Sequence, residues 1–153
     1  MSAAPDLRSF HVLQEIDIEA PAQTVFESVI AEMSVESEMP DGTPMPLTLE
    51  PWPGGRWFRD LGGEKGHLWG HVQVIKPPTL LEIYGPMFMS YPVASHLQYR
   101  LTPTPTGTRL TLSHRAFGMI PDDHLEGVQE GWAHGLKRVR EIALRRAGRT
   151  RAN

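Results

Sequence analysis

The sequence contains no cysteine, which excludes disulfide bonds, thiolate zinc sites and cysteine nucleophiles together. It also lacks any run of about 18 apolar residues, so we expect no transmembrane helix and no membrane partner. The opening residues MSAAPD do not show the basic and then apolar order of a secretory signal. Because a chain without cysteine suits a reducing compartment, we predict a cytoplasmic protein.

Familiar catalytic signatures are missing as well. The chain has no G-x-S-x-G turn, no phosphate-binding loop, no G-x-G-x-x-G and no H-E-x-x-H. Acidic residues such as Glu15, Asp17 and Glu27 fall at positions where solvent is expected. We therefore predict no cofactor and lean against an enzyme, while a histidine inside a pocket would still permit general base catalysis.

Positive charge is scarce outside the C-terminus. The net charge is −3, from 15 Lys and Arg against 18 Asp and Glu, and seven of the basic residues fall in residues 137–153 beside Glu141 alone. A nucleic-acid surface usually needs a basic face across the fold, so we expect no nucleic-acid partner. The basic cluster is interpreted as the solvated end of a helix, where cations favour the helix dipole. An anionic partner is the alternative.

Hydrophobic periodicity predicts mostly strands. In residues 10–19, alternation from Val12 to Ile18 is typical of a half-buried strand, and a short helix is expected over residues 22–33 after Pro21. Segments 37–46 and 85–92 are predicted loops, the second unusually apolar. Turn residues then separate further strands, which we expect at 47–49, 56–61, 66–76, 79–85, 95–103 and 108–117.

The last element has helical spacing instead. From Asp122 to about Arg146 the apolar positions form a single stripe, made of Leu125, Val128, Trp132, Leu136, Val139 and Ile142. A helix of this length, about 37 Å, must bury its stripe against the sheet. We predict one α+β domain over residues 10–147, between tails at 1–9 and 148–153. Its antiparallel sheet of about six to seven strands curves around the C-terminal helix.

His67 and His71 stand four residues apart and suggest half of a metal site. On a strand, residues four apart lie about 13 Å from each other, whereas two nitrogens on one zinc lie within about 4 Å. We therefore predict no metal. Strand alternation would instead place His67, Trp69, His71 and Gln73 on one face. Gly70 would allow curvature, leave room for a ligand or mark a bulge.

Several ordered segments resemble a known family. IDIEAPAQTVF at residues 16–26 is similar to the opening strand and helix of helix-grip proteins, the START-like or SRPBCC superfamily. The resemblance narrows to the branch named after the activator of Hsp90 ATPase on three further sets of segments. These are PGGR at 53–56, GHV at 70–72 with the prolines at 77–78 and leucines at 80–81, and LTLSH at 110–114 with Gly131-Trp132.

The resemblance covers residues 12 to about 143 and implies a cavity between sheet and helix. Members of the family bind hydrophobic ligands, and some catalyse cyclisations or dehydrations. The chain departs from the family in the 37–46 loop and in the methionine-rich segment 87–91. We also expect a single domain, without the additional N-terminal domain with which eukaryotic Hsp90 activators make much of their contact with the chaperone.

We therefore expect binding of a small hydrophobic or aromatic molecule without catalysis. The expected ligand-binding residues are Trp57, Trp69, His71, Tyr84, Met87, Phe88, Tyr99, His114, Trp132 and Leu136. His114 continues the alternation of Leu110 and Leu112 and is the candidate general base, with a hydrogen-bonded core histidine as the alternative. Trp132 belongs either to the core or to a pocket wall. Gly131 and Gly135 beside it cost about 1 kcal/mol each in a helix, which suggests a need for space.

Two other functions remain open. The first is a cyclase- or dehydrase-like enzyme, in which His114 or His71 removes a proton and Tyr99 or Arg100 steadies an enolate. The second is a chaperone-linked interaction module that uses the sheet or the basic C-terminus. A homodimer through the apolar segment 87–91 is also expected, because members of the family often form homodimers.

Overall fold

The structure, a computed structural model, describes the backbone of residues 6–152 and the side chains of residues 6–148. Arg149 and Arg151 of the predicted basic cluster therefore have side chains outside the described residues. No helix in the described chain is long and apolar enough to cross a membrane. The elements in chain order are β1 (Arg8–Ile18), α1 (Ala22–Glu32), β2 (Thr48–Leu49), β3 (Arg56–Gly62), β4 (Lys65–Lys76), β5 (Leu80–Gly85), β6 (Val93–Thr104), β7 (Gly107–Gly118) and α2 (His124–Ala152).

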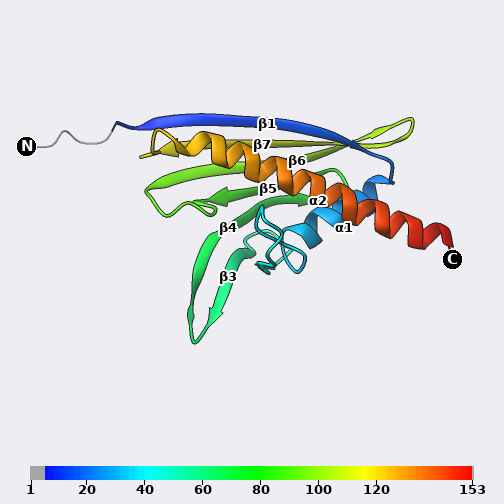
Figure 1. Ribbon diagram of the computed structural model, residues 1–153, viewed down its shortest axis with the longest axis horizontal. Coiled ribbons are helices and arrows are strands. Elements are labelled where there is room, and N and C mark those ends of the chain that lie inside the picture. Colours follow the sequence, from blue (N-terminus) through cyan, green and yellow to red (C-terminus); the bar gives the residue numbers. More distant parts are fainter. Residues whose placement is uncertain (1–5, 153) are drawn as a thin grey trace, which may run out of the picture.

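The strands form one seven-stranded antiparallel sheet in the order β1-β7-β6-β5-β4-β3-β2. Strands β2 to β7 pair in chain order, joined by turns and, between β5 and β6, by the segment 86–92, whereas β1 pairs with β7. Figure 1 shows α2 crossing one face of the sheet, with α1 packed beside its C-terminal half. The predicted α+β fold, a sheet wrapped around a long C-terminal helix, is confirmed.

Burial follows the predicted patterns. On β7 the inward positions Leu110, Leu112, His114 and Ala116 are all buried. On α2 the predicted stripe is buried from Val128 to Ile142, whereas Leu125 is 37% exposed. Burying each large apolar side chain contributes about 1.5–3 kcal/mol, so the interface between α2 and the sheet is a main source of stability.

Both ends of the fold extend beyond the expected domain limits. β1 begins at Arg8, where it pairs with Gly118 of β7, and Arg8 forms an ion pair with Asp122 just before α2. At the other end, α2 continues to Ala152, so the backbone of residues 148–152 is helical. Residues 8–9 and 148–152 therefore belong to elements of the fold.

A β-bulge changes which residues of β4 face inward. Trp57 pairs with Gly70, but the next residue of β3, Phe58, pairs with Leu68, so Trp69 is an extra residue in β4. The bulge turns Trp69 into the core, where it is 7% exposed. His71 lies on the outer face and stacks on Tyr84. The predicted common face of Trp69 and His71 is therefore wrong, because the bulge breaks the period of two.

Gly70 serves close packing between β4 and β5. A Cβ at this position would lie 2.6 Å from the carbonyl oxygen of Tyr84 and 2.9 Å from a methyl of Ile83. Of the three explanations considered from the sequence, a close approach of backbone next to a bulge fits this geometry.

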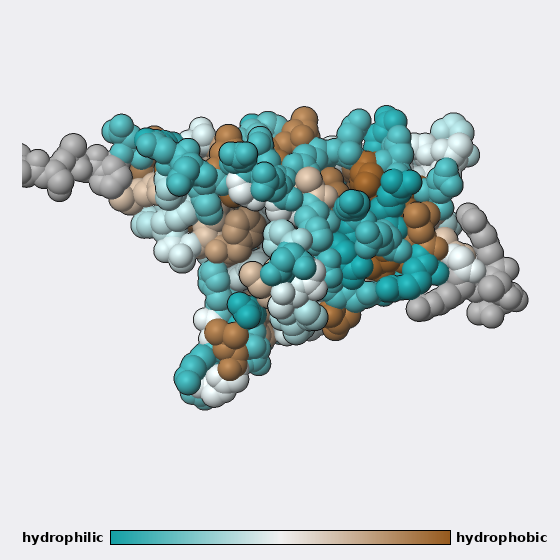
Figure 2. All heavy atoms as spheres, in the orientation of Figure 1, coloured by the Kyte–Doolittle hydropathy of each residue, from teal (hydrophilic) through white to brown (hydrophobic). Residues whose placement is uncertain are grey.

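The hairpin of β3 and β4 projects away from the rest of the molecule (Figure 1). Figure 2 shows apolar side chains near its end, where Leu61 is 58% and Leu68 45% exposed. The segment 87–91 offers less apolar surface than expected for a dimer contact, because Met87 and Met89 are buried.

Candidate ligand-binding cavity

A cavity of about 340 Å³ lies between the N-terminal half of α2, the bulged part of β3 and β4, and the segment that follows α1. We call residues 33–47 the 33–47 segment; Met33, Met39, Met45 and Leu47 are its apolar contributions to the cavity wall. The volume falls in the range of small-molecule sites, about 300–1,000 Å³, which are mostly apolar with a few polar groups.

Four aromatic side chains form a continuous aromatic wall, defined as Trp57, Trp69, Phe88 and Trp132. The ring centroids of Trp57 and Trp69 are 5.0 Å apart, those of Trp69 and Phe88 5.8 Å, and those of Phe88 and Trp132 5.9 Å. These distances are typical of favourable edge-to-face and tilted aromatic pairs. The aromatic wall therefore spans the cavity from β3 to α2.

The indole N–H groups of this wall are all bonded within the protein. Each donates a hydrogen bond: Trp57 to the carbonyl of Met33 at 2.7 Å, Trp69 to Nδ1 of His67 at 3.2 Å, and Trp132 to Nδ1 of His114 at 2.8 Å. Because these bonds fix the rings, the wall presents mainly carbon atoms to the cavity and offers no free indole donor.

The helical side of the cavity is made of glycine. Gly127, Gly131 and Gly135 lie four residues apart and share one face of α2. A Cβ at Gly127 or Gly131 would meet no other atom within 4 Å, and a Cβ at Gly135 would lie 3.2 Å from Oε1 of Glu32. The space inferred from the sequence at Gly131 and Gly135 therefore has a structural reason: Gly131 borders the open cavity, and Gly135 makes room for the side chain of Glu32. Gly127 is a third glycine on the same face of the helix.

Glu32, the last residue of α1, lines the cavity beside Gly135. No residue of the described chain donates a hydrogen bond to its carboxyl group. The cavity leaves part of the side chain accessible, yet the surrounding protein desolvates the carboxyl. Burial raises the pKa of Glu32 to about 8, Arg138 opposes the rise and Glu38 adds to it. At neutral pH this carboxyl is therefore mostly protonated and uncharged.

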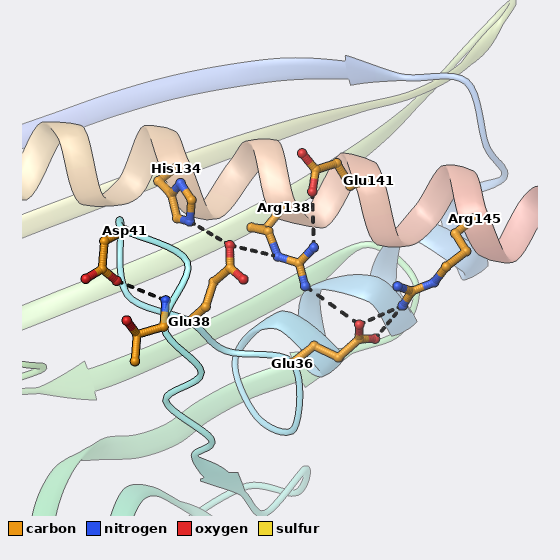
Figure 3. Close-up of polar contacts among 8 residues, drawn as sticks. Glu36, Glu38, Asp41, His134, Arg138, Glu141 and Arg145 are labelled. Carbon is orange, nitrogen blue, oxygen red and sulfur yellow. Dashed lines mark hydrogen bonds and ion pairs between the residues drawn. The ribbon is translucent and has the colours of Figure 1, made fainter.

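Ion pairs hold the 33–47 segment against α2 (Figure 3). Oε1 of Glu38 lies 2.9 Å from Nε2 of His134 and 3.3 Å from Nε of Arg138. Glu36 lies 2.6 Å from Nη2 of Arg145 and 3.7 Å from Arg138. Hydrogen bonding to Arg145 lowers the pKa of Glu36. We call these residues, Glu36, Glu38, His134, Arg138 and Arg145, the ion-pair cluster; two of them, Glu38 and His134, line the cavity.

Arg138 is the central cation of the cluster, because it also contacts Glu141 at 3.1 Å. We expect Arg138→Met to destabilise the protein by about 1–2 kcal/mol, since three carboxylates would face one another with fewer cations between them. The 33–47 segment should then be cleaved faster by a protease under native conditions. Arg140→Met removes an exposed cation from the same helix and is the matched control. Equal cleavage rates in the two variants would show that the cluster does not hold the segment.

The structure brings together four of the expected site residues and separates the others. Trp57, Trp69, Phe88 and Trp132 line the cavity. Met87, Tyr99, His114 and Leu136 are buried in the core but are not among the lining residues, and His71 and Tyr84 pair on the outer face of the sheet. The outer pair lies outside the cavity because the inward residues of that part of β4 and β5 are Val72 and Ile83.

His114 is fully buried behind Trp132. Its Nδ1 accepts the indole hydrogen bond, which places the ring proton on Nε2, 3.0 Å from Oγ of Ser95. Burial lowers the pKa of His114 to about 4, so the ring is neutral at pH 7. With both nitrogens bonded inside the protein, His114 fits the alternative of a hydrogen-bonded core histidine that orients Trp132.

The apolar segment 86–92 folds onto the core and contributes Phe88 to the cavity. Met87 and Met89 are buried. The Tyr91 hydroxyl bonds to Nδ1 of His124 and to Sδ of Met89. The methionines that face the cavity come instead from the 33–47 segment, which the sequence presents as a loop rich in turn residues.

A curved antiparallel sheet closed by a long C-terminal helix over an apolar cavity defines the helix-grip fold of the START-like, or SRPBCC, superfamily. Within it, the family model described as activator of Hsp90 ATPase homolog 1-like protein matches residues 19–143. The chain belongs to this family. A sequence comparison with proteins of curated function gave no match.

Solved structures share this fold at low sequence identity. A protein from Rhizobium leguminosarum is 16% identical over 94% of this chain and 99% of its own, with a TM-score of 0.72. The protein MLL2253 from Mesorhizobium loti is 21% identical over 89% of this chain and 98% of its own, with a TM-score of 0.66. The di-domain ARO/CYC StfQ from the steffimycin biosynthetic pathway is 12% identical over 92% of this chain but 52% of its own, with a TM-score of 0.65. At these identities the likeness shows the fold alone.

Proposed function

We propose that the protein binds a small hydrophobic or aromatic molecule in the cavity beneath α2. The observation that carries the proposal is the combination of an aromatic wall with a facing row of glycines around about 340 Å³. Burial of apolar ligand surface there would supply about 25 cal/mol per Å² removed from water. The family's fold and the cyclase-related neighbour StfQ are consistent with an aromatic ligand.

The glycine row strengthens the proposal because it carries an energetic cost. Glycine in a helix interior is less favourable than alanine by about 1 kcal/mol. At Gly127 and Gly131 a Cβ would meet nothing within 4 Å, so close packing between protein atoms does not require glycine there. Gly131 is half-buried and borders the cavity, so the open volume gives it a purpose that packing alone does not, whereas Gly127 is exposed where it meets the cavity.

Filling the cavity from the helix side tests the proposal. In Gly131→Leu the new side chain would enter the cavity, because nothing within 4 Å of its Cβ blocks it. We expect the affinity for N-phenyl-1-naphthylamine, an uncharged apolar fluorophore, to fall at least about tenfold, equivalent to 1.4 kcal/mol. The melting temperature should not fall, since leucine is the better helix former.

Gly148→Leu is the matched control for this experiment. Gly148 lies in the same helix, is exposed, and also has no atom within 4 Å of an added Cβ. The control should bind the fluorophore as the parent protein does. Failure of the parent to bind the fluorophore or a broad set of aromatic and lipid compounds would refute the proposed function.

A further inference from the structure

The polar groups of the cavity are few, and most are already bonded. Three titratable residues line it, Glu32, Glu38 and His134. Glu38 and His134 are paired with each other at 2.9 Å, and Glu38 also contacts Arg138. Glu32 alone among the three receives no hydrogen bond from the described residues. A ligand that enters the cavity thus meets one unpaired titratable side chain.

Burial and the negative charge of Glu38 favour the uncharged form of Glu32, and Arg138 opposes it. From α2, Glu32 is approached by Arg138, which is shared among Glu36, Glu38 and Glu141. The 33–47 segment adds the negative charge of Glu38. The phenol of Tyr99, on β6, is buried and interacts with Glu32; burial and Glu32 raise the pKa of Tyr99. A protonated carboxyl group has an O–H that can donate a hydrogen bond. The aromatic wall offers no free donor of this kind, because its indole N–H groups are bonded within the protein.

We propose that Glu32 is the polar anchor of this site and donates a hydrogen bond to a carbonyl oxygen of an uncharged aromatic ligand. The assignment rests on the proposed function and adds the chemical class of the ligand to it. The rings of the ligand pack on the aromatic wall, while the glycine at 135 leaves space for the carboxyl to turn into the cavity. Because the indole N–H groups are bonded within the protein, Glu32 is the titratable residue of the lining left to donate, and the Ser37 hydroxyl is a second, non-titrating donor there.

Two other ligand types fit less well. An amine would need an ionised Glu32, and burial opposes that ionisation. A carboxylate ligand would need a free basic group, and the basic side chains nearest the cavity, His134 and Arg138, already lie against the carboxylates of Glu36, Glu38 and Glu141. An aromatic ketone needs neither, because it accepts one hydrogen bond and otherwise presents apolar surface.

A carbonyl ligand that requires the protonated carboxyl has a definite pH dependence. Its affinity should be constant at low pH and should fall as pH rises through the pKa of Glu32, about 8. A bound ligand also displaces water from the carboxyl, which raises that pKa further in the complex. Binding above pH 8 should therefore take up a proton, measurable as a heat that depends on the buffer.

The test compares three probes of one shape by titration calorimetry: 2-acetylnaphthalene with a carbonyl, 2-ethylnaphthalene without one, and the cation 1-(2-naphthyl)ethylamine. At pH 7 we expect the ketone to bind about tenfold more tightly than the ethyl compound. This ratio should fall to about one in Glu32→Leu, which has no donor. It should persist in Glu32→Gln, whose amide still donates, but without the decline above pH 8.

The outcomes separate this assignment from the proposed function. If both uncharged probes bind and Glu32→Leu leaves their ratio unchanged, the cavity binds ligands but Glu32 is not the anchor. If the amine binds best, and more tightly as pH rises through 8, Glu32 acts as a carboxylate and the assignment is wrong. If no probe binds a protein with an unchanged melting temperature and circular dichroism, the proposed function fails and the assignment with it.

Discussion

Trp132→Ala should lower the free energy of unfolding by about 3–5 kcal/mol, the range expected when a large aromatic side chain is removed from a packed interior. Trp132 is 8% exposed and lies between Phe88 and His114. Its loss would remove the α2 end of the aromatic wall and leave Nδ1 of buried His114 without its donor. Urea unfolding followed by far-UV circular dichroism measures the change.

Two variants divide this effect into its parts. Trp132→Phe keeps most of the ring but removes the N–H, so it should cost about 1–3 kcal/mol, the penalty for an unsatisfied buried acceptor. Trp52→Ala removes a tryptophan that is 54% exposed and should change stability by less than about 0.5 kcal/mol. If Trp132→Phe is as stable as the parent, the indole bond to His114 contributes nothing and the role given to His114 is wrong.

The contribution of Glu32 to the free energy of unfolding should decrease as pH rises from 4.5 to 8. Because the pKa of Glu32 rises from 4.5 in the unfolded chain to about 8 in the fold, the folded state holds the proton more strongly between these values. Its contribution is therefore fully present below pH 4.5 and is lost as pH rises through 8. Relative to Glu32→Gln, which does not titrate, the parent should lose at most about 1.4 kcal/mol per pH unit in this window.

We expect a total loss of about 2–3 kcal/mol across the window, because water in the open cavity screens part of the effect. Urea unfolding of both proteins at pH values from 5 to 9 provides the measurement. Glu27→Gln removes an exposed carboxylate from the same helix and gives the baseline. A constant difference between parent and Glu32→Gln over this range would mean that the carboxyl is well solvated, and the donor role of Glu32 would lose its basis.

The fold was predictable because its first and last strands and its long helix have a clear period and turn residues separate the strands between them. Alternation in β1 and β7 and the stripe from Val128 to Ile142 follow directly from burial on one face. The extent of β1 and α2 was less predictable, because Arg8 and the residues after Ala147 are polar or small and carry no periodic signal. The inward turn of Trp69 could not be read from the period either, since a bulge of one residue reverses every face beyond it.

The candidate site was predictable only in its aromatic part. The three cavity-lining tryptophans and Phe88 stand out by residue type, whereas Met39 and Met45 lie in a loop without periodicity. Glu32 had an overlooked signal, because it falls seven residues after Val25 and three after Val29, on the buried face of α1. Its contact with Gly135 joins residues about a hundred positions apart, which only the packing of α1 against α2 reveals.

The two halves of helix α2 have different surroundings. The turns that carry Gly127, Gly131 and Gly135 border the empty volume, while Val139, Ile142, Ala143 and Ala147 are fixed in the interior. Side chains of different size placed at the first two glycines would therefore reshape the space available to a guest molecule without disturbing the anchoring half. If the proposed function holds, one helical face thus offers a small set of positions at which substitutions would change ligand preference on an unchanged scaffold.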